Sequence, residues 1–351
     1  MYKKIFMGIA AVAALTLVSC SSDDLNSLSD NSSKNEAISF DGYLGRSAVS
    51  VNGSRGSVLG LNALKGENGG FGVFGHYNEA NDIEFGSNWF DNVKVTYSST
   101  DTKWTYDPVQ YWLPQGHIDF LAYAPYDSKY NSQVTKDNQK LEFTVDSDIK
   151  KQKDLLWANA TNQTKANKTV TFTFKHALAK IGYTVKTNVV GSGTTITLNK
   201  ITLAGSDDGT SKAAFYTSGT IDLSKANGAS DLWTNQNGKQ NFPWFTESQS
   251  LISTSTFNNP ETDYLFVIPQ NFSTGTDELY VIVDYTITYN TGVTKTMKNT
   301  VYQKLEQEFK QGKAYTINLT IGLTPIDFDA EVTPWTDTDN TNTDININTW
   351  N

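Results

Sequence analysis

Apolar and polar residues alternate with a period of two along much of this chain. Segments 170–174 and 281–289 both show the alternation, and it is clearest at residues 315–323. There the residues of one face are Tyr315, Ile317, Leu319, Ile321 and Leu323. Because successive side chains of a strand point to opposite faces, each segment would bury one face and leave the other in water. The pattern predicts strands of antiparallel sheets.

Turn signals separate these segments at short intervals. Clusters of Gly, Asn, Asp and Ser occur at residues 191–193, 205–209 and 290–292, as hairpin connections require. Helical spacing is weak, and we expect only short helices or turns at residues 149–158 and 301–309. No repeat of about 20 to 50 residues is visible, which disfavours a solenoid or a propeller. The sequence therefore predicts an all-β fold.

The chain is long enough for two domains. At 351 residues it exceeds the size that one hydrophobic core usually serves. The polar stretch at residues 159–168 is the best place for a division, which predicts β-sandwich domains at residues 37–165 and 166–336. A polar tail follows at residues 337–351. Its apolar side chains are Ile345, Ile347 and Trp350.

The N-terminus has the features of an export signal. Two lysines precede an apolar run at residues 5–18, which is short for a bilayer span. Residues 1–19 are therefore predicted to be a signal peptide. They end in Leu-Val-Ser before Cys20, the single cysteine of the chain, which resembles the lipidated cysteine of a bacterial lipobox. An ordinary secretory signal with a chance cysteine is the alternative.

The stretch after this cysteine predicts a flexible tether. Residues 20–36 are rich in Ser, Asn and Asp and show no periodicity, the composition of a disordered linker. Within it, Ser-Ser-Asp-Asp at residues 21–24 resembles the acidic signal that sends some Gram-negative lipoproteins to the outer face of the outer membrane. We expect a surface-exposed lipoprotein held at the outer membrane by the lipid on Cys20.

The charge of the chain argues against nucleic-acid partners. It has 28 basic and 37 acidic residues, a net charge of 28 − 37 = −9, and loss of residues 1–19 makes this 26 − 37 = −11. Binding to phosphates needs clustered Lys and Arg. With Cys20 acylated, no thiol remains for a disulfide, a metal site or nucleophilic catalysis.

The motifs that suggest catalysis or a cofactor lack their structural context. Residues 70–75 match G-x-G-x-x-G, but no helical pattern follows, so we interpret them as a strand. His76, His117 and His176 stand in no metal-binding motif, and for His176 we expect a hydrogen bond to backbone. Residues 337–340 lack the glycine and the glutamate of an EF-hand. We expect neither enzyme activity nor a cofactor or metal.

The arginines are placed unevenly. Of 28 basic residues two are arginine, Arg46 and Arg55, either by chance or because an Arg-specific protease cuts there. The segment before them places Ile38, Phe40 and Leu44 on one face, as in a first sandwich strand. A cut after Arg46 would unlink that strand, and a strand of another molecule would then fill the vacated groove by β-augmentation.

Several short motifs, in their order along the chain, resemble the fimbrillin family of type V pilus subunits and related surface lipoproteins. They are Gly72-Val73-Phe74, residues 118–125 (IDFLAYAP), Lys153-Asp154-Leu155-Leu156, residues 172–181 (FTFKHALAKI), residues 267–270 (VIPQ) and residues 332–335 (VTPW). The resemblance covers most of the mature chain. It implies two transthyretin-like β-sandwich domains, export as a lipoprotein, cleavage by an Arg-specific protease at Arg46 or, as second choice, Arg55, and polymerisation with other pilin subunits through a donor strand.

The family pattern makes residues 337–351 the natural donor strand, although their polar composition equally admits a tip, anchor or accessory subunit. Our first hypothesis is a structural or adhesive subunit of a type V pilus, assembled by donor-strand exchange, and no receptor is indicated. The alternative is a surface glycan-binding lipoprotein of a nutrient-uptake system, in which aromatic rings stack on sugars. It would use exposed tryptophans such as Trp104, Trp112, Trp233 and Trp244.

Overall fold

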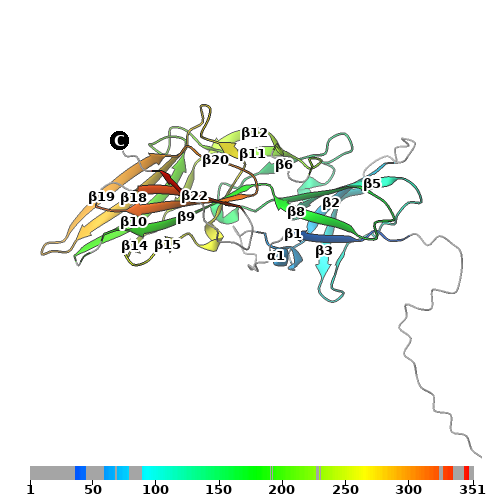
Figure 1. Ribbon diagram of the computed structural model, residues 1–351, viewed down its shortest axis with the longest axis horizontal. Coiled ribbons are helices and arrows are strands. Elements are labelled where there is room, and N and C mark those ends of the chain that lie inside the picture. The colour runs from blue at the N-terminus through cyan, green and yellow to red at the C-terminus, as the bar shows by residue number, and fades with distance from the viewer. Residues whose placement is uncertain are drawn as a thin grey trace, which may run out of the picture. The chain divides into compact units, whose positions relative to one another are not determined.

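The structure is a computed structural model that describes residues 36–44, 59–67, 69–78, 89–189, 191, 193–226, 229 and 231–323, and the backbone of residues 327–334 and 344–347. Strands make up most of this part of the chain (Figure 1). The prediction of an all-β fold is therefore confirmed. No helix in the described ranges is long and apolar enough to cross a membrane.

A seven-stranded sheet forms from the first half of the chain (Figure 1). Its strands, in spatial order, are β1 (Phe40–Leu44), β8 (Val170–His176), β7 (Leu156–Gln163), β5 (His117–Ala124), β2 (Phe71–Asn78), β3 (Phe90–Ser98) and β4 (Lys103–Thr105). Every pairing in this sheet is antiparallel except that of β1 with β8, which is parallel. β1 and β4 are its two end strands.

β2 shows why a glycine-rich string forms a strand here. Its residues from Phe71 to Tyr77 are all buried, between β3 and β5. A Cβ at Gly75 would lie 2.8 Å from the ring of Phe90, so glycine is needed to let that ring approach the backbone. The interpretation of residues 70–75 as a strand rather than a nucleotide loop is confirmed.

A three-stranded sheet joins the two halves of the chain. β6 (Lys140–Thr144), from the first half, pairs antiparallel with β11 (Phe215–Asp222), which pairs in turn with β12 (Trp233–Gln240). The indole of Trp233 also donates to the carbonyl of Ala177 at 2.7 Å. Strands of both predicted domains therefore share one sheet, at the top of Figure 1.

Two larger sheets form from the second half of the chain. The first has the order β13 (Phe242–Phe245), β10 (Thr194–Ala204), β18 (Tyr280–Tyr289) and β19 (Lys295–Lys304), with β14 (Gln249–Leu251) also on β10. The second has the order β15 (Phe257–Asn258), β9 (Ala179–Thr187), β21 (Lys313–Ile321), β22 (Asp327–Pro334) and β23 (Asp344–Ile347), with β16 (Leu265–Val267) also on β9. β9 and β21 are parallel. A separate short pair consists of β17 (Gln270–Asn271) and β20 (Glu308–Phe309).

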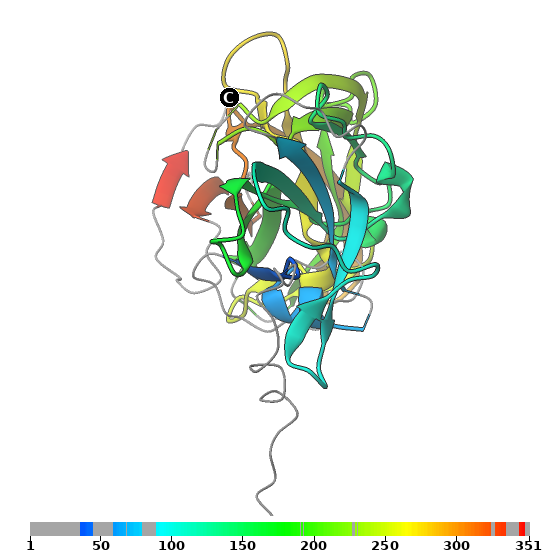
Figure 2. The same ribbon diagram turned by 90° about the vertical axis from the view of Figure 1, so that its right-hand side faces the viewer.

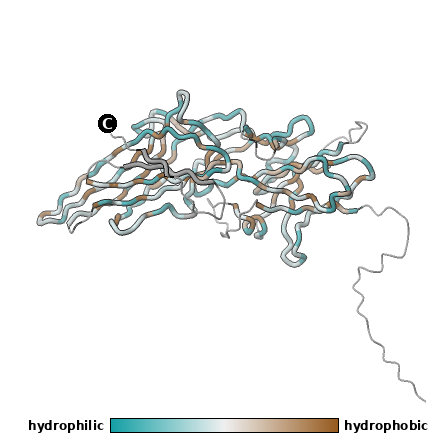
Figure 3. Tube along the Cα trace, in the orientation of Figure 1, coloured by the Kyte–Doolittle hydropathy of each residue, from teal (hydrophilic) through white to brown (hydrophobic). Residues whose placement is uncertain are grey.

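Two hydrophobic clusters form the core. The smaller one belongs to the first sheet and is rich in phenylalanine, with the buried residues Phe40, Phe71, Phe90, Phe120, Phe172 and Phe174. The larger one joins residues of both halves, from Phe74 in β2 to Ile321 in β21. Figure 3 shows brown hydrophobic residues alternating with teal hydrophilic ones along many strands, which is the alternation that predicts strands.

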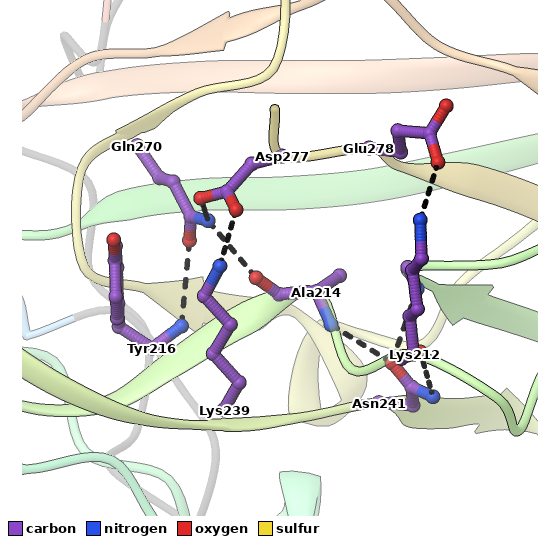
Figure 4. A network of polar contacts seen from close by, with 9 residues as sticks. Lys212, Ala214, Tyr216, Lys239, Asn241, Gln270, Asp277 and Glu278 are labelled. Carbon is purple, nitrogen blue, oxygen red and sulfur yellow. Dashed lines mark hydrogen bonds and ion pairs between the residues drawn. The ribbon is translucent and has the colours of Figure 1, made fainter. Parts of the chain in front are cut away.

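A polar network fastens the β11–β12 hairpin to the loop before β18 (Figure 4). The side chain of Gln270 accepts from the amide of Tyr216 at 3.3 Å and donates to the carbonyl of Ala214 at 2.9 Å. It also donates to Asp277 at 3.1 Å, and Asp277 pairs with Lys239 at 2.5 Å. Gln270 is 7% exposed, so its amide satisfies backbone groups of the hairpin that would otherwise be buried without partners.

Helices are few and short in the described ranges. They are α1 (Leu61–Lys65) and the 3-10 turns η2 (Ser128–Tyr130), η3 (Ile149–Lys151) and η4 (Glu261–Asp263). Of the short helix or turn expected at residues 149–158, η3 covers Ile149–Lys151, but β7 begins at Leu156, so the end of that range is strand. The helical expectation at residues 301–309 is wrong, because β19 continues to Lys304 and Val301 lies opposite Val283 of β18. Cross-strand pairing overrides the local spacing here.

The first sheet runs past residue 165, where we placed the end of the first domain. β8 begins at Val170 and pairs with both β1 and β7. A division by sheets would fall after His176, before β9. The described residues from Glu36 onward group as one compact unit, and the division into two domains stays a prediction.

Candidate functional site

The segment of residues 36–44, which ends in β1, contacts both ends of the first sheet. On one side β1 pairs with β8 along its whole length. On the other side, two backbone hydrogen bonds of 2.9 Å join Ile38 to Gln110 and Glu36 to Trp112, in the stretch that follows β4. We call the space that residues 36–44 fill, between β8 and this stretch, the β1 slot.

The inward face of this segment carries the side chains that the sequence predicts for it. Ile38, Phe40 and Leu44 are 2%, 4% and 6% exposed, whereas Asp41 and Tyr43, which alternate with them, are exposed. The strand predicted here is confirmed. Burying each of the three anchors contributes roughly 1.5–3 kcal/mol to holding the strand in place.

Phe40 is the central anchor of the β1 slot. Its ring centroid lies 5.5 Å from that of Phe90 in β3, 5.3 Å from Phe120 in β5 and 5.8 Å from Phe172 in β8. The ring of Tyr106 is 5.2 Å away. The contacts with Phe90 and Phe120 are edge-to-face, a favourable geometry for aromatic pairs. Three strands of the sheet therefore contribute to one pocket.

Between Phe40 and Leu44 the β1 slot has almost no room for a side chain. A Cβ at Gly42 would lie 3.2 Å from the ring of Phe174 and 3.4 Å from the ring of Phe71. Both rings are buried, and their centroids are 5.2 Å apart. Because protein interiors are closely packed, these rings cannot move far, and they limit the size of the side chain at residue 42.

Polar groups hold the start of the segment at both rims of the β1 slot. The carbonyl of Ser39 accepts from the amide of Val170 at 2.8 Å. The hydroxyl of Tyr106 donates to the carbonyl of Ile38 at 2.8 Å. Burial raises the pKa of the Tyr106 hydroxyl above its ordinary value, against the lowering effect of its hydrogen bond with Gln110. The role of Tyr106 could not be predicted from the sequence, because Tyr106 is far from residue 38 along the chain.

The predicted processing sites Arg46 and Arg55 lie outside the described residues. The described chain stops at Leu44, two positions before Arg46, and resumes at Leu59. The amide of Leu59 donates to the carboxylate of Asp154 at 3.1 Å. Both flanks of the arginine-bearing stretch are therefore fixed to the fold.

Asp154 is a functional candidate that we did not select from the sequence. It is 0% exposed, and its Oδ2 lies 2.8 Å from Nδ1 of His176, which is 8% exposed. His176 thus has a buried carboxylate as a partner, which the sequence analysis did not predict, and its expected backbone hydrogen bond stays a prediction. The signal was present in the Lys-Asp-Leu-Leu motif at residues 153–156, where an acid stands beside two apolar residues.

The proposed donor strand pairs with its own chain in this structure. β23 lies antiparallel to β22, with Ile345 opposite Ala330 and Ile347 opposite Phe328. Figure 2 shows these two strands, in red tones, side by side. Trp350 lies outside the described residues, as does the predicted lipidation site Cys20.

The tryptophans that would stack on glycans are enclosed. Trp104, Trp112 and Trp244 are 7%, 4% and 5% exposed, and Trp233 is only partly exposed. Trp244 lines a surface pocket of about 440 Å³, but its indole donates to the carbonyl of Asp263 at 2.8 Å. At these positions the tryptophans form core rather than a sugar platform.

His76 and His117 lie on neighbouring strands, where Asp119 of β5 stands opposite His76 and two positions after His117. His76 is buried in β2, and Nε2 of His117 lies 4.0 Å from Asp119 in β5. Within the described ranges, no three His, Cys, Asp or Glu side chains gather as metal ligands would.

The chain is similar to a known protein family and to solved structures. The family model described as fimbrillin-like matches residues 63–335, well over half of the chain. A fimbrial protein from Bacteroides vulgatus ATCC 8482 has 22% sequence identity and a TM-score of 0.63, with 86% of this chain and 100% of that chain covered. A fimbrilin from Porphyromonas gingivalis W83 has 10% identity and a TM-score of 0.45, with 87% and 99% covered.

No curated protein matches the chain. The likeness to the Bacteroides vulgatus structure supports the fold, and the family model covers the strands from β2 to β22. This chain belongs to the fimbrillin-like family.

Proposed function

We propose that this fimbrillin-like protein is a structural and adhesive subunit of a type V pilus, exported as a lipoprotein and assembled by donor-strand exchange after a protease cut. One observation carries the proposal. Residues 36–44 fill the β1 slot with three buried anchors and end two positions before Arg46. The strand that would be lost is thus both an end strand of its sheet and adjacent to the predicted cut.

A single cut changes how residues 36–44 are held. β1 is an end strand, and residues 45–58 are its only covalent link to the rest of the fold. After a cut there, an intramolecular contact becomes a bimolecular one and loses its high effective concentration. Three anchors of roughly 1.5–3 kcal/mol each still hold the strand. The cut segment therefore stays until an incoming strand displaces it.

The vacated β1 slot favours capture of another strand. Loss of residues 36–44 would uncover one edge of β8, with unpaired backbone groups, beside the phenylalanine-rich cluster. Exposed edges and contiguous apolar surface both drive association. A strand from a second subunit restores both the ladder and the packing.

Displacement of the cut segment would also free the protein from the membrane. The proposed lipid on Cys20 lies on the N-terminal side of Arg46, together with the tether at residues 20–36. After cleavage at Arg46, our first choice, or at Arg55, displacement of β1 thus removes the anchor with it. Both arginines precede Leu59, whose amide is fixed to Asp154, so either cut leaves the remaining fold attached.

The tail at residues 337–351 is our proposed donor to a neighbouring subunit. β23 is an end strand that pairs only with β22 among the described strands. Fifteen extended residues span roughly 50 Å, enough to reach an adjacent molecule. Ile345, Ile347 and Trp350 would be its anchors.

The test is limited proteolysis of the purified mature chain with an Arg-specific protease. We expect cuts only at Arg46 and Arg55 and an intact body. A labelled peptide of residues 36–45, added in excess, should co-elute with the protein in size-exclusion chromatography only after the cut. The matched control is the double variant Arg46→Lys, Arg55→Lys, which keeps both charges and should stay uncut and bind no peptide. Cut protein that takes up no peptide at any concentration would rule out assembly by strand exchange.

A further inference from the structure

The β1 slot has a size restriction in its middle that bears on which strand enters it. Its pockets for Ile38, Phe40 and Leu44 take large side chains, and these residues are 2%, 4% and 6% exposed. The position between the last two belongs to Gly42, where an added Cβ would meet the buried rings of Phe174 and Phe71 at 3.2 and 3.4 Å.

We propose, on the basis of the proposed function, that the β1 slot selects an incoming strand with glycine or alanine between two large apolar residues, and so rejects the tail of a second copy of this chain. The partner is then a different subunit. Its entering strand has the pattern large-x-large-x-small-x-large, as residues 38–44 do.

The limit on size comes from rings that are themselves locked. Phe174 is 1% exposed and Phe71 is 0% exposed. Phe71 also packs edge-to-face on Trp104 at 5.0 Å, and Phe174 lies 5.9 Å from Phe172. A methyl group would require these rings to shift by a few tenths of an ångström. A branched or longer side chain would place further atoms inside them, and overpacking of this kind is destabilising.

Gly42 is present because of the limited space beside it and not because the chain turns there. Gly42 lies in the middle of β1, opposite Phe172 of β8. Glycine weakens a strand interior and often marks a site of close approach. No left-handed backbone angle occurs at Gly42, so space rather than conformation accounts for the residue.

The tail of this chain does not meet the requirement in any register. Residues 337–351 contain neither glycine nor alanine, so every alignment puts a larger side chain at the small position. If Ile345 and Ile347 take the first two large pockets, Thr349 falls at the small position and Asn351 in the Leu44 pocket. A polar side chain without a partner in that pocket costs further free energy.

The contacts at both ends of the β1 slot also require an entering strand of a minimum length. Residues 36–38 pair with the stretch after β4, and Phe40–Leu44 pair with β8. An entering strand must therefore satisfy backbone groups on two rims over nine positions, 44 − 36 + 1. A strand with only two anchors would leave part of this ladder open.

The experiment uses the mature chain after cleavage and measures binding of labelled peptides by fluorescence anisotropy. The peptides are the native sequence of residues 36–45, its Gly42→Ala, Gly42→Val and Tyr43→Val variants, and residues 337–351. We expect the native, Gly42→Ala and Tyr43→Val peptides to bind with similar affinity, because Tyr43 is 43% exposed. The Gly42→Val and tail peptides should bind roughly 10- to 100-fold more weakly.

Similar affinity of the Gly42→Val or tail peptide and the native peptide would overturn the proposal. If no peptide binds, including the native one, the proposed function fails instead, because the strand is then not exchangeable. The size restriction at residue 42 can also be tested in the uncut chain. There Gly42→Val should lower the unfolding midpoint and Tyr43→Val should not. Equal midpoints for these two variants would also overturn the size restriction.

Discussion

Nδ1 of His176 lies 2.8 Å from Oδ2 of Asp154, and the same carboxylate oxygen accepts the amide of Leu59 at 3.1 Å. One buried acid thus ties the end of β8 to the first described residue after the arginine-bearing stretch. This contact marks where the removable part of the chain would end.

Asp154→Ala should therefore be strongly destabilising. The substitution removes the carboxylate shared by His176 and the Leu59 amide, and loss of one partner from a buried polar pair costs about 3 kcal/mol or more. Urea denaturation measures the free energy of unfolding. Asp137→Ala, at an exposed position, is the control and should change it by less than about 0.5 kcal/mol. Equal effects of the two variants would contradict this role.

Phe40→Ala should cost roughly 3–5 kcal/mol of the free energy of unfolding, because it empties a pocket lined by four rings. Tyr43→Ala, three positions along the same strand but 43% exposed, should stay close to wild type. Thermal unfolding of the uncut chain compares the two. A small effect of Phe40→Ala would mean that the β1 slot is not a site of strong packing.

Alkaline pH should loosen the start of the β1 segment. Burial raises the pKa of Tyr106 in the folded state, so folding favours the protonated hydroxyl. The stabilisation is complete below the unfolded value of about 10 and is lost as pH rises through the higher folded value. Hydrogen exchange of the Ile38 amide at increasing pH would follow this loss.

Tyr106→Phe is the control for that pH dependence. It removes the hydroxyl that donates to the Ile38 carbonyl at 2.8 Å, at a cost of about 1 kcal/mol. It should also abolish the part of the alkaline transition that belongs to this residue. An unchanged transition in the variant would assign the effect to other tyrosines.

Gln270→Ala should release the β11–β12 hairpin locally. The variant leaves the Tyr216 amide and the Ala214 carbonyl without the partner that the side chain supplies, at a cost of about 1–3 kcal/mol. Faster hydrogen exchange at the Tyr216 amide is the expected readout. Gln115→Ala, at an exposed position, should leave that rate unchanged, and a matching rate in both variants would count against the network.

The strands were predictable because their apolar residues repeat every second position. Residues 315–321 form β21 as expected, while Leu323 lies beyond its end and is 52% exposed. Ile38, Phe40 and Leu44 were found for the same reason. Their alternation is a local property of the sequence.

Partners distant along the chain were not predictable. Neither the parallel pairing of β1 with β8 nor the pairing of β6 with β11 leaves a trace in local periodicity. The space at Gly42 depends on the rings of Phe174 and Phe71, which only the fold brings together. The contacts of Tyr106 and Asp154 were not predictable either, because Ile38 and Leu59 lie many residues away in sequence.

The shared three-stranded sheet has a consequence for the order of folding. Thr144 of β6 lies opposite Ser218 of β11, 218 − 144 = 74 residues later, and Phe40 lies opposite Val170, 170 − 40 = 130 residues later. During synthesis from the N-terminus, both strands must wait with open edges until their partners arrive. Such distant pairings slow folding and expose intermediates to aggregation. The topology therefore makes the newly made chain dependent on protection before it is complete.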